Sequence, residues 1–238
     1  MRRTAALLTA CLLLLLAACG GGQRESVQEM ENPSVTATAD VTEDGRLLAG
    51  IAGSYQELFP VLRRDEYRQI WLDNCATVVG EADAEATADM LIAAVTGTLT
   101  GEEAVSAYPD GNGAYCCAFL QGVERFNFDG SLFSGTDADG KELFRHEYRF
   151  AGMDENTGMY VFESADADAG EFTCFCFAPD TPSETYHIEF RYGSDRDSLS
   201  HFDAGPYAYW MAAGIPVDCD QTMIENCIAL FCAENLAG

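Results

Sequence analysis

The region from Gly113 to Gly193 alternates between apolar and polar residues in short runs, and turn sequences such as Asp129-Gly130 separate the runs. A period of two is typical of β-strands, and Asp-Gly dipeptides are typical of tight hairpins. The pattern predicts seven strands, at residues 115–120, 123–128, 131–136, 142–150, 159–164, 171–177 and 185–193. Because closing a sheet removes its exposed edges, we expect an antiparallel up-and-down β-barrel.

Apolar residues at helical spacing lie on both sides of this strand region. Residues 48–62, 67–79 and 90–95 each form an apolar stripe before it, and a last stripe follows from about Asp220. Such stripes are typical of helices that face a protein core. The predicted fold class is therefore mainly β, with an N-terminal helical segment before the barrel and a C-terminal helix after it.

The first residues have the order of a bacterial lipoprotein signal. Two arginines precede a short apolar run, which ends in Leu-Ala-Ala-Cys at Cys19. We interpret residues 1–18 as a signal peptide and Cys19 as the lipidated first residue of the mature protein. Residues 19–46 contain few large apolar side chains, which is typical of a flexible tether. The folded domain is then expected at residues 47–238.

The charge of the chain and the motifs missing from it argue against two classes of function. The formal net charge is −26, whereas proteins that bind nucleic acid need a basic surface. The sequence contains no glycine-rich phosphate loop, no His-Glu-x-x-His motif and no Gly-x-Ser-x-Gly motif. We therefore expect neither a nucleic-acid partner nor an enzyme.

The run at residues 185–193 carries the clearest candidate for a binding site. Successive side chains of a strand point to opposite faces, so His187, Glu189 and Arg191 share one face. The residues between them are apolar and suited to packing. An imidazole and a carboxylate two residues apart on a strand can converge on one metal ion.

Several segments resemble one known family. They include Gly53-Ser-Tyr-Gln-Glu-Leu-Phe-Pro60, Phe128-Asp-Gly130, Glu147-Tyr148 and His187-Ile-Glu-Phe-Arg-Tyr-Gly193. From about Gly50 onwards the chain resembles the ZinT (YodA) family of bacterial extracytoplasmic zinc-binding proteins. This domain also forms the C-terminal half of AdcA-type zinc-binding lipoproteins. The resemblance implies a lipocalin-like (calycin) barrel preceded by helices, with zinc as the cofactor.

In that family the site strand reads His-x-His-x-x-x-Gly, and a third histidine lies nine residues before the first. Carried over residue by residue, His187 matches the first histidine, Glu189 occupies the second position and Ala178 the third. The resemblance therefore implies His187 and Glu189 as zinc ligands, and an affinity below that of a three-histidine relative.

Two further residues are weaker candidates for the missing ligand. Cys176 shares a strand face with Ala178, and its thiolate would be a good zinc ligand, although a small buried hydrophobic role is the more common one. Asp180 follows the same predicted strand and is otherwise read as a turn residue.

Eight cysteines remain beyond the signal peptide and Cys19, and none of them forms a Cys-x-x-Cys motif. The spacing does not determine how they pair. Cys174 and Cys176 lie on the same face of one predicted strand, about 7 Å apart and beyond disulfide reach. We expect no bond between these two.

These observations give one leading functional prediction and one alternative. The leading prediction is a lipoprotein anchored at the extracytoplasmic face of a bacterial cell membrane, which binds a divalent metal, zinc in the first place. It would supply a zinc importer, as a partner of an ABC transporter component. The alternative is a degenerate lipocalin-like barrel without metal, which acts as a small-ligand-binding or surface-interaction lipoprotein.

The lipid anchor can be tested by replacing the acylated cysteine. Cys19→Ala should release the protein from membranes, because its thiol is the predicted point of lipid attachment. The measurement is fractionation of cells that express the parent or the variant. A variant that still sediments with membranes as the parent does would show that Cys19 is not the anchor.

Overall fold

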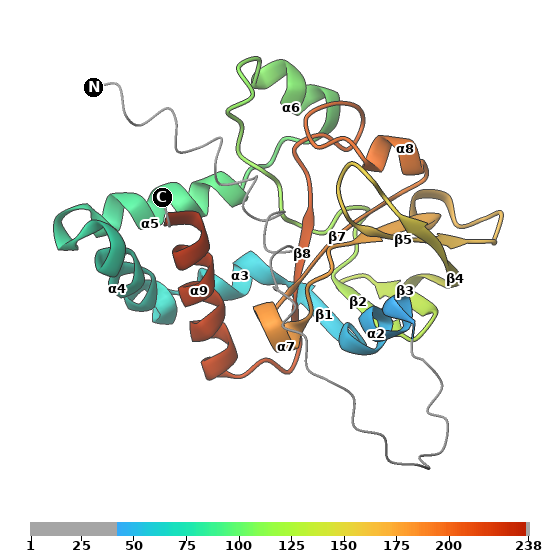
Figure 1. Cartoon of the computed structure of the whole chain (residues 1–238), viewed down its shortest axis with the longest axis horizontal. Helices are drawn as coiled ribbons and strands as arrows, with labels where there is room; N and C mark the ends of the chain where they lie inside the picture. Colours follow the sequence, from blue (N-terminus) through green and yellow to red (C-terminus); the bar gives the residue numbers. More distant parts are fainter. Residues whose placement is uncertain (1–41, 237–238) are drawn as a thin grey trace, which may run out of the picture.

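The computed structural model describes residues 42–236, in which eight strands form one closed barrel in chain order (Figure 1). The strands are β1 (Gly53–Glu57), β2 (Arg125–Asp129), β3 (Leu132–Thr136), β4 (Glu142–Met153), β5 (Tyr160–Ser164), β6 (Cys174–Phe177), β7 (Ile188–Gly193) and β8 (Ala212–Pro216). Each strand is antiparallel to the next, and β8 returns to pair with β1. The predicted up-and-down barrel is confirmed.

Three details of the strand prediction are wrong. Residues 115–120 form no strand, and only isolated bridges join Cys116 to other segments. Residues 53–57, predicted within a helical stripe, form β1, because they pair with β2 on one side and β8 on the other. Residues 212–216 were not predicted as a strand and form β8. The conformation of these segments depends on strands that are distant in sequence. The local alternation of apolar and polar residues does not reveal such partners.

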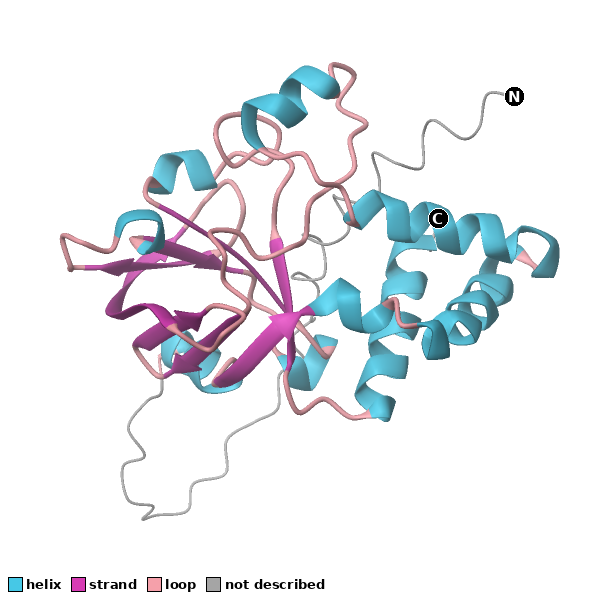
Figure 2. Ribbon diagram, turned by 180° about the vertical axis from the view of Figure 1, so that it is seen from behind, coloured by secondary structure: helices cyan, strands magenta, loops and turns pink. Residues whose placement is uncertain are grey.

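Helices precede, interrupt and follow the series of strands. They are α2 (Glu43–Gly50), α3 (Leu58–Leu62), α4 (Arg68–Val79), α5 (Glu81–Val95), α6 (Gly101–Ala107), α7 (Pro182–Thr185), α8 (Arg196–Leu199) and α9 (Gln221–Leu236), with 3-10 turns at Asp65–Tyr67 and Gly170–Phe172. Helices α4, α5 and α9 gather on one side of the barrel (Figure 2). Within residues 42–236, no helix combines the length and the apolar character needed to cross a membrane.

The predicted lipid anchor and most of the tether lie outside the described residues. The predicted domain boundary at residue 47 falls inside α2, where Leu47 is buried and Glu43 begins the helix. The last residues of the predicted tether therefore belong to α2, which packs on the domain through Leu47.

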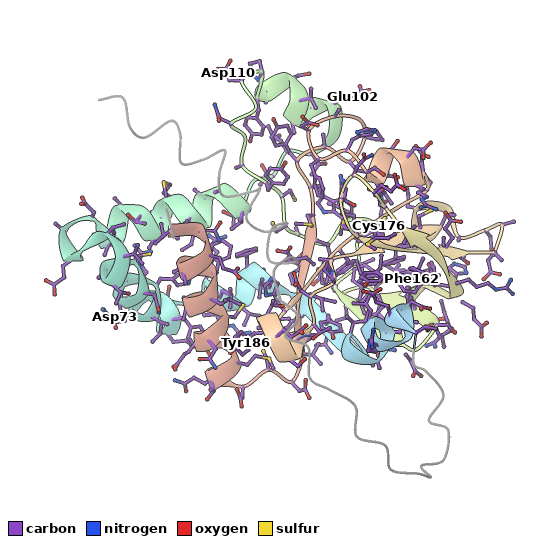
Figure 3. All side chains as sticks on the ribbon, in the orientation of Figure 1. Asp73, Glu102, Asp110, Phe162, Cys176 and Tyr186 are labelled. Carbon is purple, nitrogen blue, oxygen red and sulfur yellow. The ribbon has the colours of Figure 1, made fainter. Side chains whose placement is uncertain are left out.

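Aromatic rings fill the interior of the barrel. Phe126 contacts Phe190 and Tyr192 with ring centroids 5.0 and 5.1 Å apart, and Phe162 lies 5.9 Å from Phe177 (Figure 3). An eight-stranded barrel is just wide enough for side chains to fill. The apolar residues of β7 therefore point inward, and its polar residues point outward, as the period of two predicted.

The outward face of β7 carries a fully buried arginine. The guanidinium of Arg191 donates hydrogen bonds to the backbone carbonyl oxygens of Leu199, His201 and Tyr207, and it lies 4.5 Å from the ring centre of Phe202. Burial lowers the pKa of Arg191 to about 10, so the side chain keeps its charge at neutral pH. Among residues 42–236, its Nε has no hydrogen-bond partner. This arginine holds the segment 199–207 against the barrel.

Replacing Arg191 with lysine should loosen that segment. Lysine keeps the positive charge but lacks the rigid planar fork, so at least one buried carbonyl loses its donor, at a cost of about 1–3 kcal/mol. Urea denaturation measures the change in the free energy of unfolding. Arg149→Lys, at an exposed position on β4, is the control and should change stability by less than about 0.5 kcal/mol. Equal stability of both variants would contradict the role given to Arg191.

Candidate functional site

The candidate site begins at the turn between α7 and β7. Pro182 opens α7, and Tyr186 ends it in the left-handed conformation with φ of 69°. This turn delays the start of β7 to Ile188, whereas the sequence predicted a strand from residue 185. Tyr186 lies between α9 and the barrel (Figure 3). The turn therefore places the next residue, His187, at the junction between the barrel and the helices.

The backbone of the same turn orients the imidazole ring. Nδ1 of His187 lies 2.7 Å from the carbonyl oxygen of Thr185, which can only accept a hydrogen bond. Nδ1 must therefore carry the proton, so in the neutral ring Nε2 has a free lone pair. Nε2 lies 3.6 Å from Oε1 of Glu189, and both residues are only 8% exposed. The two predicted donors face each other at a buried position.

Further ionisable side chains surround this pair. Asp180, between β6 and α7, and Glu234, on α9, both interact electrostatically with His187 and Glu189. The Sγ atom of Cys227, also on α9, lies 3.8 Å from Nδ1 of His187. His187 thus contacts Glu189 and Cys227 where α9 packs against the barrel, and Asp180 and Glu234 act on this pair through their charge.

The environment changes the pKa values of these groups. Burial lowers the pKa of His187, but its interactions with Cys227 and Glu189 outweigh burial and leave the pKa well above its usual value. Burial raises the pKa of Asp180, and the nearby charge of Glu189 raises it further. Burial likewise raises the pKa of Glu234. Burial thus disfavours the ionised forms of Asp180 and Glu234, whereas Glu189 and Cys227 favour the positively charged form of His187.

The structure places the other predicted donors at different distances from the pair. Ala178 lies beside it, because its N–H donates to the carbonyl oxygen of Glu189 over 2.9 Å. Cys176 pairs with Arg191 across the strands, one pleat away, and its charged neighbours include Arg191 rather than His187. Burial raises the pKa of Cys176 to about 12, which disfavours the thiolate. Of the two weaker candidates, Asp180 is the one near the pair.

The zinc that the fold family implies has two suitable donors here. The Nε2 atom of a neutral imidazole and a carboxylate oxygen are ordinary zinc ligands, and the hydrogen bond from Nδ1 to a carbonyl is typical of a ligating histidine. Because the pKa of His187 is raised, zinc would have to displace the proton on Nε2. In the part of the chain that the structure describes, no three side chains of His, Cys, Asp or Glu converge closely enough to hold a metal ion. A third donor would have to come from water or from a carboxyl group that moves.

The sequence prediction missed the residues that α9 and the loop before β2 supply. Glu234 and Cys227 are seven residues apart and therefore share a helix face, and both lie in the helix predicted from about Asp220. That spacing was a usable signal. Burial raises the pKa of the half-buried Cys117 thiol, and the nearby charge of Glu189 raises it further. No local pattern indicated that Cys117 would lie there.

Comparison with solved structures supports the fold. The chain is similar to the Zn(II)-bound ZinT-like domain of Streptococcus pneumoniae AdcA, with a TM-score of 0.50 and 16% identity over 82% of this chain and 94% of that domain. It also matches Zn(II)-bound AdcA from Streptococcus pneumoniae, with a TM-score of 0.46 and 16% identity over 84% of this chain and 41% of that protein. The resemblance to ZinT-like domains is therefore confirmed as a resemblance of fold.

The sequence comparisons found no relative. No protein-family model matches the chain, and no curated protein matches it. The likeness to ZinT-like domains is carried by structure at an identity of 16%.

The electrostatic pairing of His187 with Glu189 predicts the direction of a titration. Glu189→Gln should lower the pKa of His187, measured by NMR of the ring protons, because it removes the neighbouring negative charge. Glu225→Gln, on the exposed side of α9, should leave it unchanged. A His187 pKa at or below 6.5 in the parent protein would contradict the pairing.

The same pairing affects stability in a defined pH range. Because the pKa of His187 is raised in the folded state, the pair stabilises the protein fully below the unfolded-state pKa of about 6.5. That contribution is lost as the pH rises through the higher folded-state pKa.

Proposed function

We propose that this domain binds a divalent metal ion, zinc in the first place, through Nε2 of His187 and the carboxylate of Glu189. The observation that carries the proposal is the orientation of the imidazole, whose Nδ1 bonds to the carbonyl oxygen of Thr185 while Nε2 faces Glu189. The carboxyl groups of Asp180 and Glu234 also interact electrostatically with this pair. When bound, zinc would supply the positive charge that this site lacks.

Asp180 is the third donor that we propose, and Glu234 is the other carboxyl group in position to contribute. Both are partly buried and both interact electrostatically with the pair, which makes them the carboxyl groups from which a third oxygen donor would come. Water would complete a tetrahedral set. Two or three oxygen donors and one nitrogen should bind zinc more weakly than three histidines.

The proposed cellular role is that of an extracytoplasmic lipoprotein anchored through Cys19, which holds zinc and passes it to an importer. The signal-like sequence before Cys19 supports the anchor, and the resemblance to zinc-binding lipoproteins supports the role in zinc supply. The proposed activity is binding without catalysis. The alternative, a barrel that holds a small ligand in its interior, gains no support from an interior filled by aromatic rings.

Zinc binding can be measured as a rise in thermal stability. Zinc at about a hundredfold over its dissociation constant should stabilise the protein by roughly 2.7 kcal/mol, or about 5–10 °C in Tm. His187→Ala should abolish the rise, whereas His201→Ala, which changes an exposed side chain, should preserve it. The shift should be larger at pH 8 than at pH 6, because protons compete for Nε2.

Elemental analysis of the purified parent protein provides an independent measurement. About one zinc per chain is expected after dialysis against zinc and removal of the excess. A parent protein that shows no thermal shift with zinc at pH 8 and retains no zinc would refute the proposed function.

A further inference from the structure

Two buried thiols lie in contact away from the His187 site. The Sγ atoms of Cys75, on α4, and Cys232, on α9, are 3.9 Å apart, and the two residues are 0% and 1% exposed. They are 157 residues apart in the chain. The contact therefore joins two helices that no short loop connects.

The surrounding packing holds these two helices together. Trp71 of α4 and Phe59 of α3 each contact Phe231 of α9, with ring centroids 5.7 Å apart in both cases. Phe231 directly precedes Cys232, so the ring that packs α9 against α3 and α4 is next to the thiol in the chain. A disulfide has an S–S length of about 2.05 Å, so the two sulfur atoms need to approach by only about 2 Å.

We propose that Cys75 and Cys232 are a disulfide-forming pair, which a disulfide-carrying oxidant links covalently. One thiolate attacks the disulfide of the oxidant, forms a mixed disulfide and releases one thiol. The other cysteine then attacks the sulfur of its partner in this chain and releases the second thiol. Two thiols of this chain are oxidised, and one disulfide of the oxidant is reduced to two thiols.

The packing also determines when this exchange takes place. The thiolate is the reactive form, and burial raises the pKa of both Cys75 and Cys232. In the folded protein the pair is therefore closed to an oxidant in solution. In the unfolded chain both thiols are accessible until α9 docks on α4, so the bond forms during folding.

The bond would fix one wall of the proposed metal site. Five residues before Cys232 on the same helix, Cys227 contacts the imidazole of His187. A covalent link from α9 to α4 would hold this helix in place against the barrel. The link itself does not depend on metal, so its test can be carried out without zinc and is separate from the test of the proposed function.

The test is to refold the full chain from its reduced, unfolded form in a buffer of reduced and oxidised glutathione that contains a chelator. Peptide mapping under non-reducing conditions should then find Cys75 joined to Cys232. The oxidised protein should melt at a Tm roughly 5–15 °C above that of the reduced protein. Dithiothreitol added during unfolding should remove the difference.

Two variants make the measurement specific. Cys232→Ala should abolish the difference in Tm between oxidised and reduced protein. Cys174→Ala, which removes another buried thiol on β6, should preserve it. Maps in which Cys75 and Cys232 stay unlinked, or are joined to other cysteines, would overturn the proposal. If Cys232→Ala does not fold, the map of the parent protein alone decides.

Discussion

The pairing of β1 with β8 is the contact on which the rest of the structure depends. These strands come from opposite ends of the described chain, and Gln56 of β1 lies opposite Ile215 of β8. Helix α3 follows β1 directly, and α9 begins a few residues after β8. Closing the barrel therefore brings both helical segments to one side, where α4 and α9 pack on each other. Without the pairing of β1 with β8, α4 and α9 would not be brought together.

Strand β7 has a structural role on both of its faces. Its inward residues, among them Phe190 and Tyr192, complete the aromatic interior. Its outward residues are buried as well, because α9 covers one end of the strand and the segment 199–207 covers the other. Arg191, beneath the segment 199–207, is satisfied mainly by backbone carbonyls. Glu189, at the end covered by α9, has His187 as its one ion-pair partner among residues 42–236. The same strand face thus supports the fold at one position and leaves a charge available at the other.

The barrel was predictable from sequence because its signals are local. Alternation, hairpin turns such as Asp129-Gly130 and the polar face of β7 are all visible in single segments. β1 and β8 were missed because each is defined by the strands it pairs with and not by a local alternation of its own. The resemblance placed His187, Glu189 and Ala178 together, and the structure shows them adjacent.

The surroundings of the site were less predictable for the same physical reason. The contact of α9 with β7 results from tertiary packing, and a helical stripe shows which face is buried but not what it is buried against. The stripe from about Asp220 predicted a buried helix face that includes Cys227. It did not predict that Cys227 would contact His187. Cys117 belongs to a segment predicted as a strand, and the irregular path of that segment brings its thiol near Glu189.

The electrostatics of the site bear directly on the metal binding that we propose. Three carboxyl groups, Asp180, Glu189 and Glu234, lie near one imidazole, and burial raises the pKa of Asp180 and of Glu234. A raised pKa means that the ionised form is less stable there than in water, so ionising these groups at neutral pH costs folding free energy. One imidazolium offsets only part of this repulsion. A divalent cation would offset more of it, and its binding would convert an electrostatic cost of folding into a contribution to stability.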